Sequence, residues 1–415
     1  MEVLTALDIG TSKISCIIAE ADAEGNMDVV GHGVSPCLGL RKGALVDPEQ
    51  TVHAIETAVS EAEKEAGYTI NSVHLCLSSE YLSSLPSQGV WAVSNPENEI
   101  SAIDVRRVVE AARMVGIPSD REILHIVPRG FTVDGQNGIR NPVGLTGLRL
   151  EVETHVVAAA SSFLQNICKC VQKANLEIDA DGLVASTIAS GLAVLTDEER
   201  KLGTAMIDIG AGTVDLAVYC DEEIGHSAVL PVAGDLLTHD LARFFRIPPS
   251  QAERLKLDKG LVSPDYLESS EDDLHDETIE VTSLSGEELV PVSRHQLAEV
   301  LEARLLDIFE WVAEECKKAE RRGLVVASLV MTGGTSQLPG LARLARRELE
   351  MPVRVAAACY PQGLPEQLGS PIYATGVGLL LYAAARRFTP EEKEEGPSRM
   401  KVLLGRVGRW LAEVF

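Results

Sequence analysis

Two stretches of the chain share one pattern of apolar and polar positions. Residues 3–19 read VLTALDIGTSKISCIIA, and residues 204–219 read TAMIDIGAGTVDLAVY. Each has an apolar run ending in Asp-Ile-Gly, then small polar residues, then a run of alternating side chains. A period of two is typical of a strand, so each stretch is predicted to form a strand, a tight turn and a returning strand. The two copies lie 200 residues apart, which is too long a period for a solenoid and indicates two halves of similar build.

Between these stretches, apolar residues at helical spacing predict several helices, over residues 51–67, 104–116 and 294–321. Short apolar runs such as residues 328–331 are typical of buried strands. Strands and helices mixed along the whole chain predict an α/β fold. The longest helix carries an apolar stripe of Leu297, Val300, Leu301, Leu305, Ile308 and Val312.

The composition narrows the possible functions. The chain has 415 residues, of which 45% are hydrophobic, and a net charge of −25. The length suggests about three domains. The acidic excess argues against a broad nucleic-acid-binding surface and against a body that binds anionic lipid. The densely acidic residues 265–280 lack the spacing of a calcium loop and are expected to form a solvated loop.

Targeting and metal signals are weak. The eight cysteines show no zinc-ligand spacing, so reduced thiols are expected. The first residues lack the basic region of a signal peptide. The longest apolar stretch, residues 372–385, is shorter than a membrane-spanning helix and is expected to form a buried helix.

The two glycine turns have the chemistry of phosphate-binding loops. Small residues let backbone N–H groups approach phosphate oxygens, while hydroxyl groups and one lysine add donors. An aspartate at the end of each first strand can hold Mg²⁺ through water. Two ordinary hairpins are the alternative, but the repetition favours a polyphosphate held between the turns. The residues concerned are Asp8, Gly10, Thr11, Ser12 and Lys13 in the first copy, and Asp208, Gly210, Ala211, Gly212 and Thr213 in the second.

Neither of the common nucleotide-binding fingerprints is present. The second turn begins like G-x-G-x-x-G, but its sixth position is Asp215 and a strand follows instead of a helix. The chain also lacks G-x-x-x-x-G-K-[ST]. A dinucleotide fold and a P-loop enzyme are therefore disfavoured.

Three further segments fit a nucleotide site. A flat base can lie against glycine backbone after the strand over residues 328–331, and a helix is expected to begin beside the second turn. On the helix after that, two charged residues three positions apart can face a ribose or base. These segments supply Gly333, Gly334, Thr335 and Ser336, then Gly234 and Asp235, and last Glu253 and Lys256.

With these residues in view, the chain resembles the actin-like ATPase superfamily, which includes actin, sugar kinases and heat-shock chaperones. Residues 8–13 resemble its first phosphate motif, residues 208–215 its second, and residues 332–340 its adenosine motif. Residues 179–195 and 371–383 are similar to its two connecting helices. The resemblance implies two ribonuclease-H-like halves around a cleft that binds ATP and Mg²⁺.

Within that superfamily, the sequence most resembles the bacterial cell-division family FtsA. Residues 124–128, LHIVP, and residues 138–147, GIRNPVGLTG, carry this resemblance. It implies an inserted subdomain 1C, which mediates self-association and contacts with later division proteins. The implied divisions are subdomain 1A at 1–80 and 163–198, 1C at 81–162, 2A at 199–240 and 325–388, and 2B at 241–324.

The last residues carry a net positive charge, opposite in sign to that of the rest of the chain. A polar linker, residues 389–398, precedes residues 399–415, whose apolar stripe and basic flank are typical of a helix lying in a membrane interface. A terminal helix docked on the core is the alternative. The stripe comprises Met400, Leu403, Leu404, Val407, Leu411, Val414 and Phe415, with Trp410 at its edge and Lys401, Arg406 and Arg409 beside it.

The resemblance leaves catalysis open. Related proteins carry Glu or Gln in the first connecting helix to orient the attacking water. Residues 182–196, GLVASTIASGLAVLT, contain neither, and Ser186 stands where the acid is expected. We therefore expect nucleotide binding with slow or negligible hydrolysis, and we assign no catalytic residue.

The resemblance implies an ATP-binding protein that polymerises at the cytoplasmic side of the membrane, at the division septum. There it is expected to tether the FtsZ ring and recruit later division proteins. Subdomain 2B is expected to bind the C-terminal peptide of FtsZ, with Arg294 and Arg304 as candidate contacts, although solvated helix charges explain both at least as well. A sugar or acid kinase and a pilus-assembly actin homologue are the rival interpretations. Residues 141–147 and the basic tail favour the division protein over both.

Overall fold

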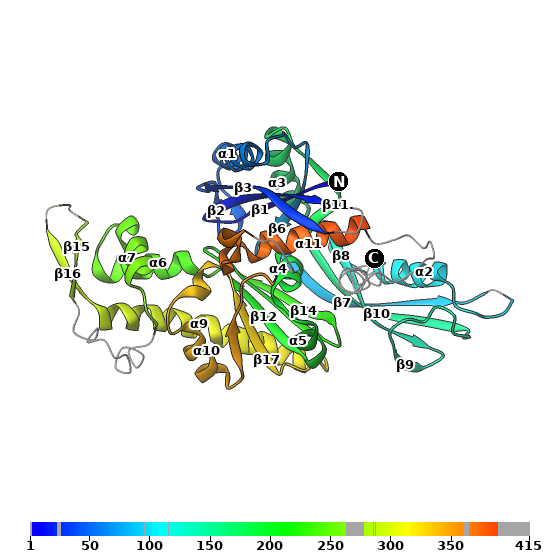
Figure 1. Ribbon diagram of the computed structural model, residues 1–415. Helices are drawn as coiled ribbons and strands as arrows, with labels where there is room; N and C mark the ends of the chain where they lie inside the picture. Colours follow the sequence, from blue (N-terminus) through cyan, green and yellow to red (C-terminus); the bar gives the residue numbers. More distant parts are fainter. Residues whose placement is uncertain are drawn as a thin grey trace.

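The computed structural model describes residues 2–22, 26–94, 96–114, 116–262, 278–284, 286, 288–359 and 365–388. The predicted linker and C-terminal helix, residues 389–415, lie outside this range, as does most of the acidic segment. The chain forms two halves, each built on a five-stranded sheet, with further elements at both ends of the molecule (Figure 1).

The sheet of the first half has the strand order β11-β6-β1-β2-β3. Strands β1 and β2 form the predicted hairpin, in which Asp8 lies opposite Ser15. Helices α1 (Pro48–Ala66) and α3 (Ser161–Lys173) pack on one face of this sheet. The strands are β1 (Glu2–Ile9), β2 (Lys13–Ala21), β3 (Met27–Pro36), β6 (Ser72–Leu77) and β11 (Glu177–Ala185).

The second half repeats this topology. Its order is β14-β13-β12-β17-β18, so in both halves an antiparallel three-strand meander is followed by two parallel strands. Asp208 lies opposite Asp215 in the second hairpin. The predicted duplication is confirmed. The strands are β12 (Thr204–Ile209), β13 (Val214–Cys220), β14 (Glu223–Leu230), β17 (Ser328–Thr332) and β18 (Val353–Val355).

Two helices, α4 (Ser186–Val194) and α11 (Ala374–Phe388), lie between the sheets (Figure 1). Their core draws side chains from both halves, for example Ile17 of β2 and Met206 of β12. Helix α11 contains most of the predicted buried apolar stretch, after a short 3-10 turn, η3 (Pro371–Tyr373). Within the described residues, no helix is long and apolar enough to cross a bilayer.

The expected helix over residues 179–195 is wrong in its first part. Residues up to Ala185 belong to strand β11, and the helix begins only at Ser186. Residues 184 and 185 are part of the strand because they pair with Cys76 and Leu77 of β6. This pairing buries the short apolar run in the sheet.

One insertion extends the first half. It is a separate sheet with the order β7-β10-β8-β9, covered by α2 (Ala102–Arg113) around a small core of its own. It packs on β14 of the second half, where Ser84 donates a hydrogen bond to the carbonyl of Ser227 at 2.7 Å. Its strands are β7 (Leu82–Ala92), β8 (Arg121–Val133), β9 (Gln136–Ile139) and β10 (Arg149–Ala160).

A second insertion extends the other half. Helix α9 confirms the predicted long helix, and its stripe is buried except for the half-buried Val300. Its elements are α6 (Gly234–Phe245), α7 (Pro249–Lys259), β15 (Thr278–Thr282), β16 (Leu289–Ser293) and α9 (Arg294–Glu320). Helix α10 (Leu341–Leu349) lies outside this insertion, between β17 and β18.

The edge strand β3 is covered by side chains of α1. The carboxylate of Glu65 accepts from the backbone N–H of His32 at 2.8 Å, and that of Glu61 accepts from Val34 at 3.2 Å. The helix comes this close because Gly33 faces it: a Cβ there would lie 1.9 Å from the carbonyl oxygen of Ala58. Two N–H groups of this edge are therefore already bonded.

The contact between α4 and α11 generates the first prediction. A Cβ on Gly378 would lie 1.8 Å from the carbonyl oxygen of Ala189, so Gly378→Ala must push the two helices apart. We expect a loss of about 2–3 kcal/mol in the free energy of unfolding, measured by denaturant titration.

Gly130→Ala is the matched control, because a Cβ on Gly130 meets nothing within 4 Å. Its stability should stay within about 0.5 kcal/mol of the wild-type value. Equal stability of the two variants would contradict close packing of the connecting helices.

Candidate functional site

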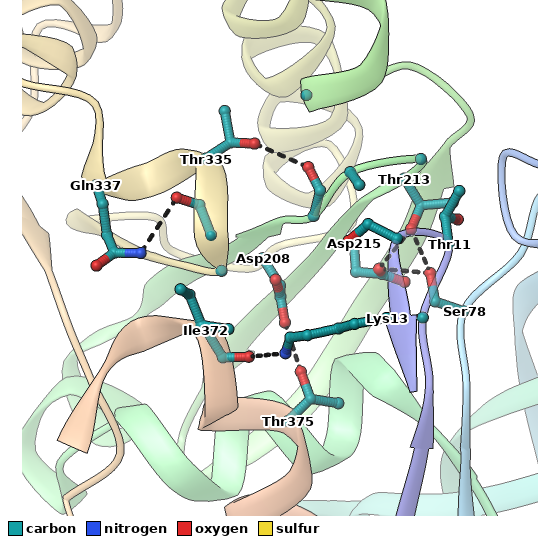
Figure 2. Close-up of a pocket in the computed structure, with 18 of the residues that line it drawn as sticks. Thr11, Lys13, Ser78, Asp208, Thr213, Asp215, Thr335, Gln337, Ile372 and Thr375 are labelled. Carbon is teal, nitrogen blue, oxygen red and sulfur yellow. Dashed lines mark hydrogen bonds between the residues drawn. The ribbon is translucent and has the colours of Figure 1, made fainter. Parts of the chain in front are cut away.

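A cavity of about 520 Å³ lies between the two halves. It is lined by both glycine turns, by the segment after β17, and by residues of α7. Of the residues predicted to bind a nucleotide, all but Asp235 and Ser336 line it. Figure 2 shows residues of both halves pointing into this space.

The two glycine turns have equivalent geometry. In the first, the N–H of Gly10 donates to the carbonyl of Lys13 at 3.0 Å; in the second, Gly210 donates to Thr213 at the same distance. The turns also touch, since a Cβ on Gly212 would lie 2.3 Å from the hydroxyl oxygen of Thr11. Backbone from both halves thus meets at one wall of the cavity.

The two predicted metal-binding aspartates both line this cavity. Burial raises the pKa of Asp8 to about 6, although the nearby Lys13 lowers it. Burial also raises the pKa of Asp208, while hydrogen bonds from Thr375 at 2.7 Å and Ser190 at 2.8 Å oppose the shift. Carboxylates in such surroundings favour a nearby cation, and oxygen donors are those that Mg²⁺ prefers.

A third buried carboxyl belongs to the site and was not predicted as a site residue. Asp215 accepts hydrogen bonds from Ser186 at 2.6 Å and from Ser78 at 2.6 Å. It also bonds Thr213, and Figure 2 shows Ser78 and Thr213 beside it. Burial, followed by repulsion from Asp208, raises its pKa to about 7. An acid inside the otherwise apolar strand β13 was a usable signal. Ser78 gave no such signal in the sequence, because only the topology of the sheet brings the end of β6 to the cavity.

Lys13 crosses the cavity toward the other side of the cleft. Its ammonium donates to the carbonyl oxygen of Ile372 at 2.9 Å and lies 4.5 Å from the ring centroid of Tyr373. Burial lowers the pKa of this lysine, and attraction to Asp8 and Asp208 opposes that shift.

Backbone after β17 forms a further part of the cavity wall. Gly333 has a φ of +86°, and a Cβ there would lie 2.3 Å from Oδ1 of Asp208. A Cβ on Gly334 would meet only Ile372, at 3.7 Å, so this position has room beside it. Thr335 fixes the segment to the second turn by donating to the carbonyl of Gly210 at 2.8 Å. Ser336 instead bonds within its own turn, to Gly333 at 2.7 Å.

The charged residues of α7 brace the cavity wall. The buried ammonium of Lys256 bonds Glu253 at 2.7 Å, Thr238 at 2.9 Å and the carbonyl of Gly234 at 3.0 Å. Thr238 also donates to Glu253. Lys256 therefore joins α6 to α7, and its contact with a ribose or base remains a prediction. Asp235 lies behind the wall, with its N–H bonded to the carbonyl of Ala211 at 2.7 Å.

The two candidate contacts for a partner peptide lie elsewhere, on α9. Arg294 begins the helix. Arg304 donates to Asp240 and to Asp307, both at 2.7 Å. Its charge is therefore already compensated within the chain.

Comparison with known proteins assigns the family. A family model described as "Cell division protein FtsA" matches residues 205–378, and one described as "SHS2 domain inserted in FTSA" matches residues 79–158. Cell division protein FtsA of Pseudomonas aeruginosa is 38% identical over 93% of this chain and 90% of its own length. FtsA of Escherichia coli K12 is 34% identical over 99% of this chain and 96% of its own length.

Solved structures agree on the fold. The PilM-PilN type IV pilus biogenesis complex gives a TM-score of 0.65 at 18% identity, covering 92% of this chain and 98% of the other. MreB5 of Spiroplasma citri, solved bound to ADP, gives 0.53 at 12% identity, covering 92% and 97%. These likenesses support an actin-like fold, and the sequence relatives identify the branch. The chain belongs to the FtsA family of bacterial cell division proteins.

Proposed function

We propose that this chain is an actin-like ATP-binding protein that polymerises at the membrane, tethers the FtsZ ring there and recruits later division proteins. The observation that carries the proposal is the pair of equivalent glycine turns facing one cavity, in a chain of the FtsA family. The site of action would be the cytoplasmic side of the cell membrane, at the division septum.

The ligand of this cavity would be ATP. The phosphates would lie against the turns at Gly10 and Gly210, with hydroxyl groups and Lys13 as further donors. The base would lie along Gly333 and Gly334. Asp8 and Asp208 would hold Mg²⁺ through water, which would offset the unfavourable burial of two carboxylates.

The tether would use other parts of the chain. Residues 399–415 would lie in the membrane interface, where each basic residue adds about 1 kcal/mol near anionic lipid. One such helix binds weakly, so polymerisation would supply avidity. Subdomain 2B would receive the FtsZ peptide. Since Arg304 is already paired with Asp240, a contact there would require the peptide to replace that aspartate.

Blocking the adenosine wall tests nucleotide binding. In Gly334→Val the added methyl groups would enter the space beside this residue, where the base is expected. We expect at least about a tenfold loss of ATP affinity by isothermal titration calorimetry. Gly130→Val, on a strand away from the cavity, should bind ATP like the wild type. Unchanged affinity in Gly334→Val would place the base elsewhere.

Co-sedimentation with anionic vesicles, FtsZ and Mg-ATP tests the tether. The chain should carry FtsZ into the pellet, whereas a chain lacking residues 399–415 should leave both proteins in the supernatant. FtsZ without its C-terminal peptide is the matched control and should stay behind while the chain still pellets. Undiminished sedimentation of the truncated chain would refute the membrane anchor.

Phosphate release tests the expectation of slow turnover. Ser186 stands where the acid that orients the attacking water is expected, and it has no acidic group. The carboxylate of Asp215 already accepts hydrogen bonds from two hydroxyl groups. Release from saturating Mg-ATP should stay near background in a colorimetric assay. A rate of about 1–100 s⁻¹, as in kinases, would overturn this expectation.

A further inference from the structure

Lys13, the lysine expected to bind phosphate, contacts an aromatic stack that lies outside the two glycine turns. Lys13 lies over the ring of Tyr373, with its ammonium 4.5 Å from the ring centroid. His32 of β3 meets the same ring edge-on, at 4.9 Å between centroids and an angle of 89°. Three residues from three separate elements, β2, β3 and η3, therefore form one stack.

The stack is anchored at both ends. The backbone N–H of His32 is bonded by Glu65 of α1, and the His32 ring lies 3.4 Å from the hydroxyl of Ser15. At the other end, the carbonyl of Pro371 accepts from the N–H of Gly333 at 3.3 Å. The turn that carries Tyr373 is thus bonded to the adenosine wall of the second half, while the ring of Tyr373 contacts two strands of the first.

The two contacts of the Lys13 ammonium differ in whether they use one of its N–H donors. The carbonyl of Ile372 takes one of its three N–H donors. The ring face attracts the cation electrostatically and takes none. A lysine has a flexible four-carbon stem, and Asp8 and Asp208 also attract this one. The ring therefore restrains the ammonium while leaving donors for another ligand.

We infer that Tyr373 is a positioning residue for phosphate binding: its ring face holds the Lys13 ammonium at the cavity, and His32 holds the ring in place. This inference rests on the proposed binding of ATP. It predicts that Tyr373 contributes to affinity only for ligands that carry phosphate, and only through Lys13. A residue that merely packs the hinge would affect all ligands alike.

A double-mutant cycle with three ligands tests the inference. ATP, ADP and adenosine are titrated by calorimetry into the wild type, Tyr373→Leu, Lys13→Met and the double variant. We expect Tyr373→Leu to weaken ATP and ADP about fivefold, the size of a partly buried cation–π contact. Adenosine should change by less than about twofold, and in the Lys13→Met background Tyr373→Leu should have no further effect.

Tyr373→Phe is the matched control, since it keeps the ring face and should bind ATP like the wild type. His32→Ala leaves Tyr373 itself intact and should give a smaller loss, again confined to ATP and ADP. It replaces Tyr373→Leu in the cycle should that variant fail to fold by circular dichroism.

The outcomes separate the two proposals. Equal losses for all three ligands, an unchanged ATP affinity in Tyr373→Leu, or additive losses in the double variant would overturn the role of Tyr373. A wild-type chain that binds none of the three ligands would overturn the proposed function, and this inference with it.

Discussion

Asp208 and Asp215 are carboxylates buried at the cavity where the two halves of the chain meet. A buried carboxylate is costly unless donors or a cation compensate it. Asp208 obtains donors from both helices that lie between the halves, Ser190 of α4 and Thr375 of α11. Its neighbours Asp8 and Asp215 draw on Lys13, Ser78 and Ser186. The same bonds that make these charges tolerable also hold the two halves around the cavity.

Because the topology is duplicated, the two copies of one residue pattern can meet in a single site. Both halves order their strands alike, so both glycine turns follow the first strand of a meander. Helices α4 and α11 lie between the two sheets, and this arrangement brings the turns face to face. The large insertions are added to this duplicated frame, one on each half, and both contact it: the first packs on β14, and the second places α7 at the cavity.

Much of this frame was predictable because it is local. Both hairpins follow from alternation around a glycine turn, and the long helix follows from its apolar stripe. The extension of β11 through Ala185 did not, since a short apolar run fits a buried helix as well as a strand, and only pairing with β6 decides. Ser78 and Tyr373 escaped prediction for a related reason. Ser78 reaches the cavity, and Tyr373 reaches the ammonium of Lys13, through long-range contacts that no local pattern reveals.

The glutamates that cover β3 have a consequence for assembly. An open strand edge can accept a foreign strand, and this risk grows where copies of a chain are crowded together. Glu61 and Glu65 occupy the N–H groups of Val34 and His32, so β3 offers little for such pairing. Contacts between crowded copies at this edge would then have to be made by side chains, which can be selective and reversible. A continuous sheet running from copy to copy would be neither.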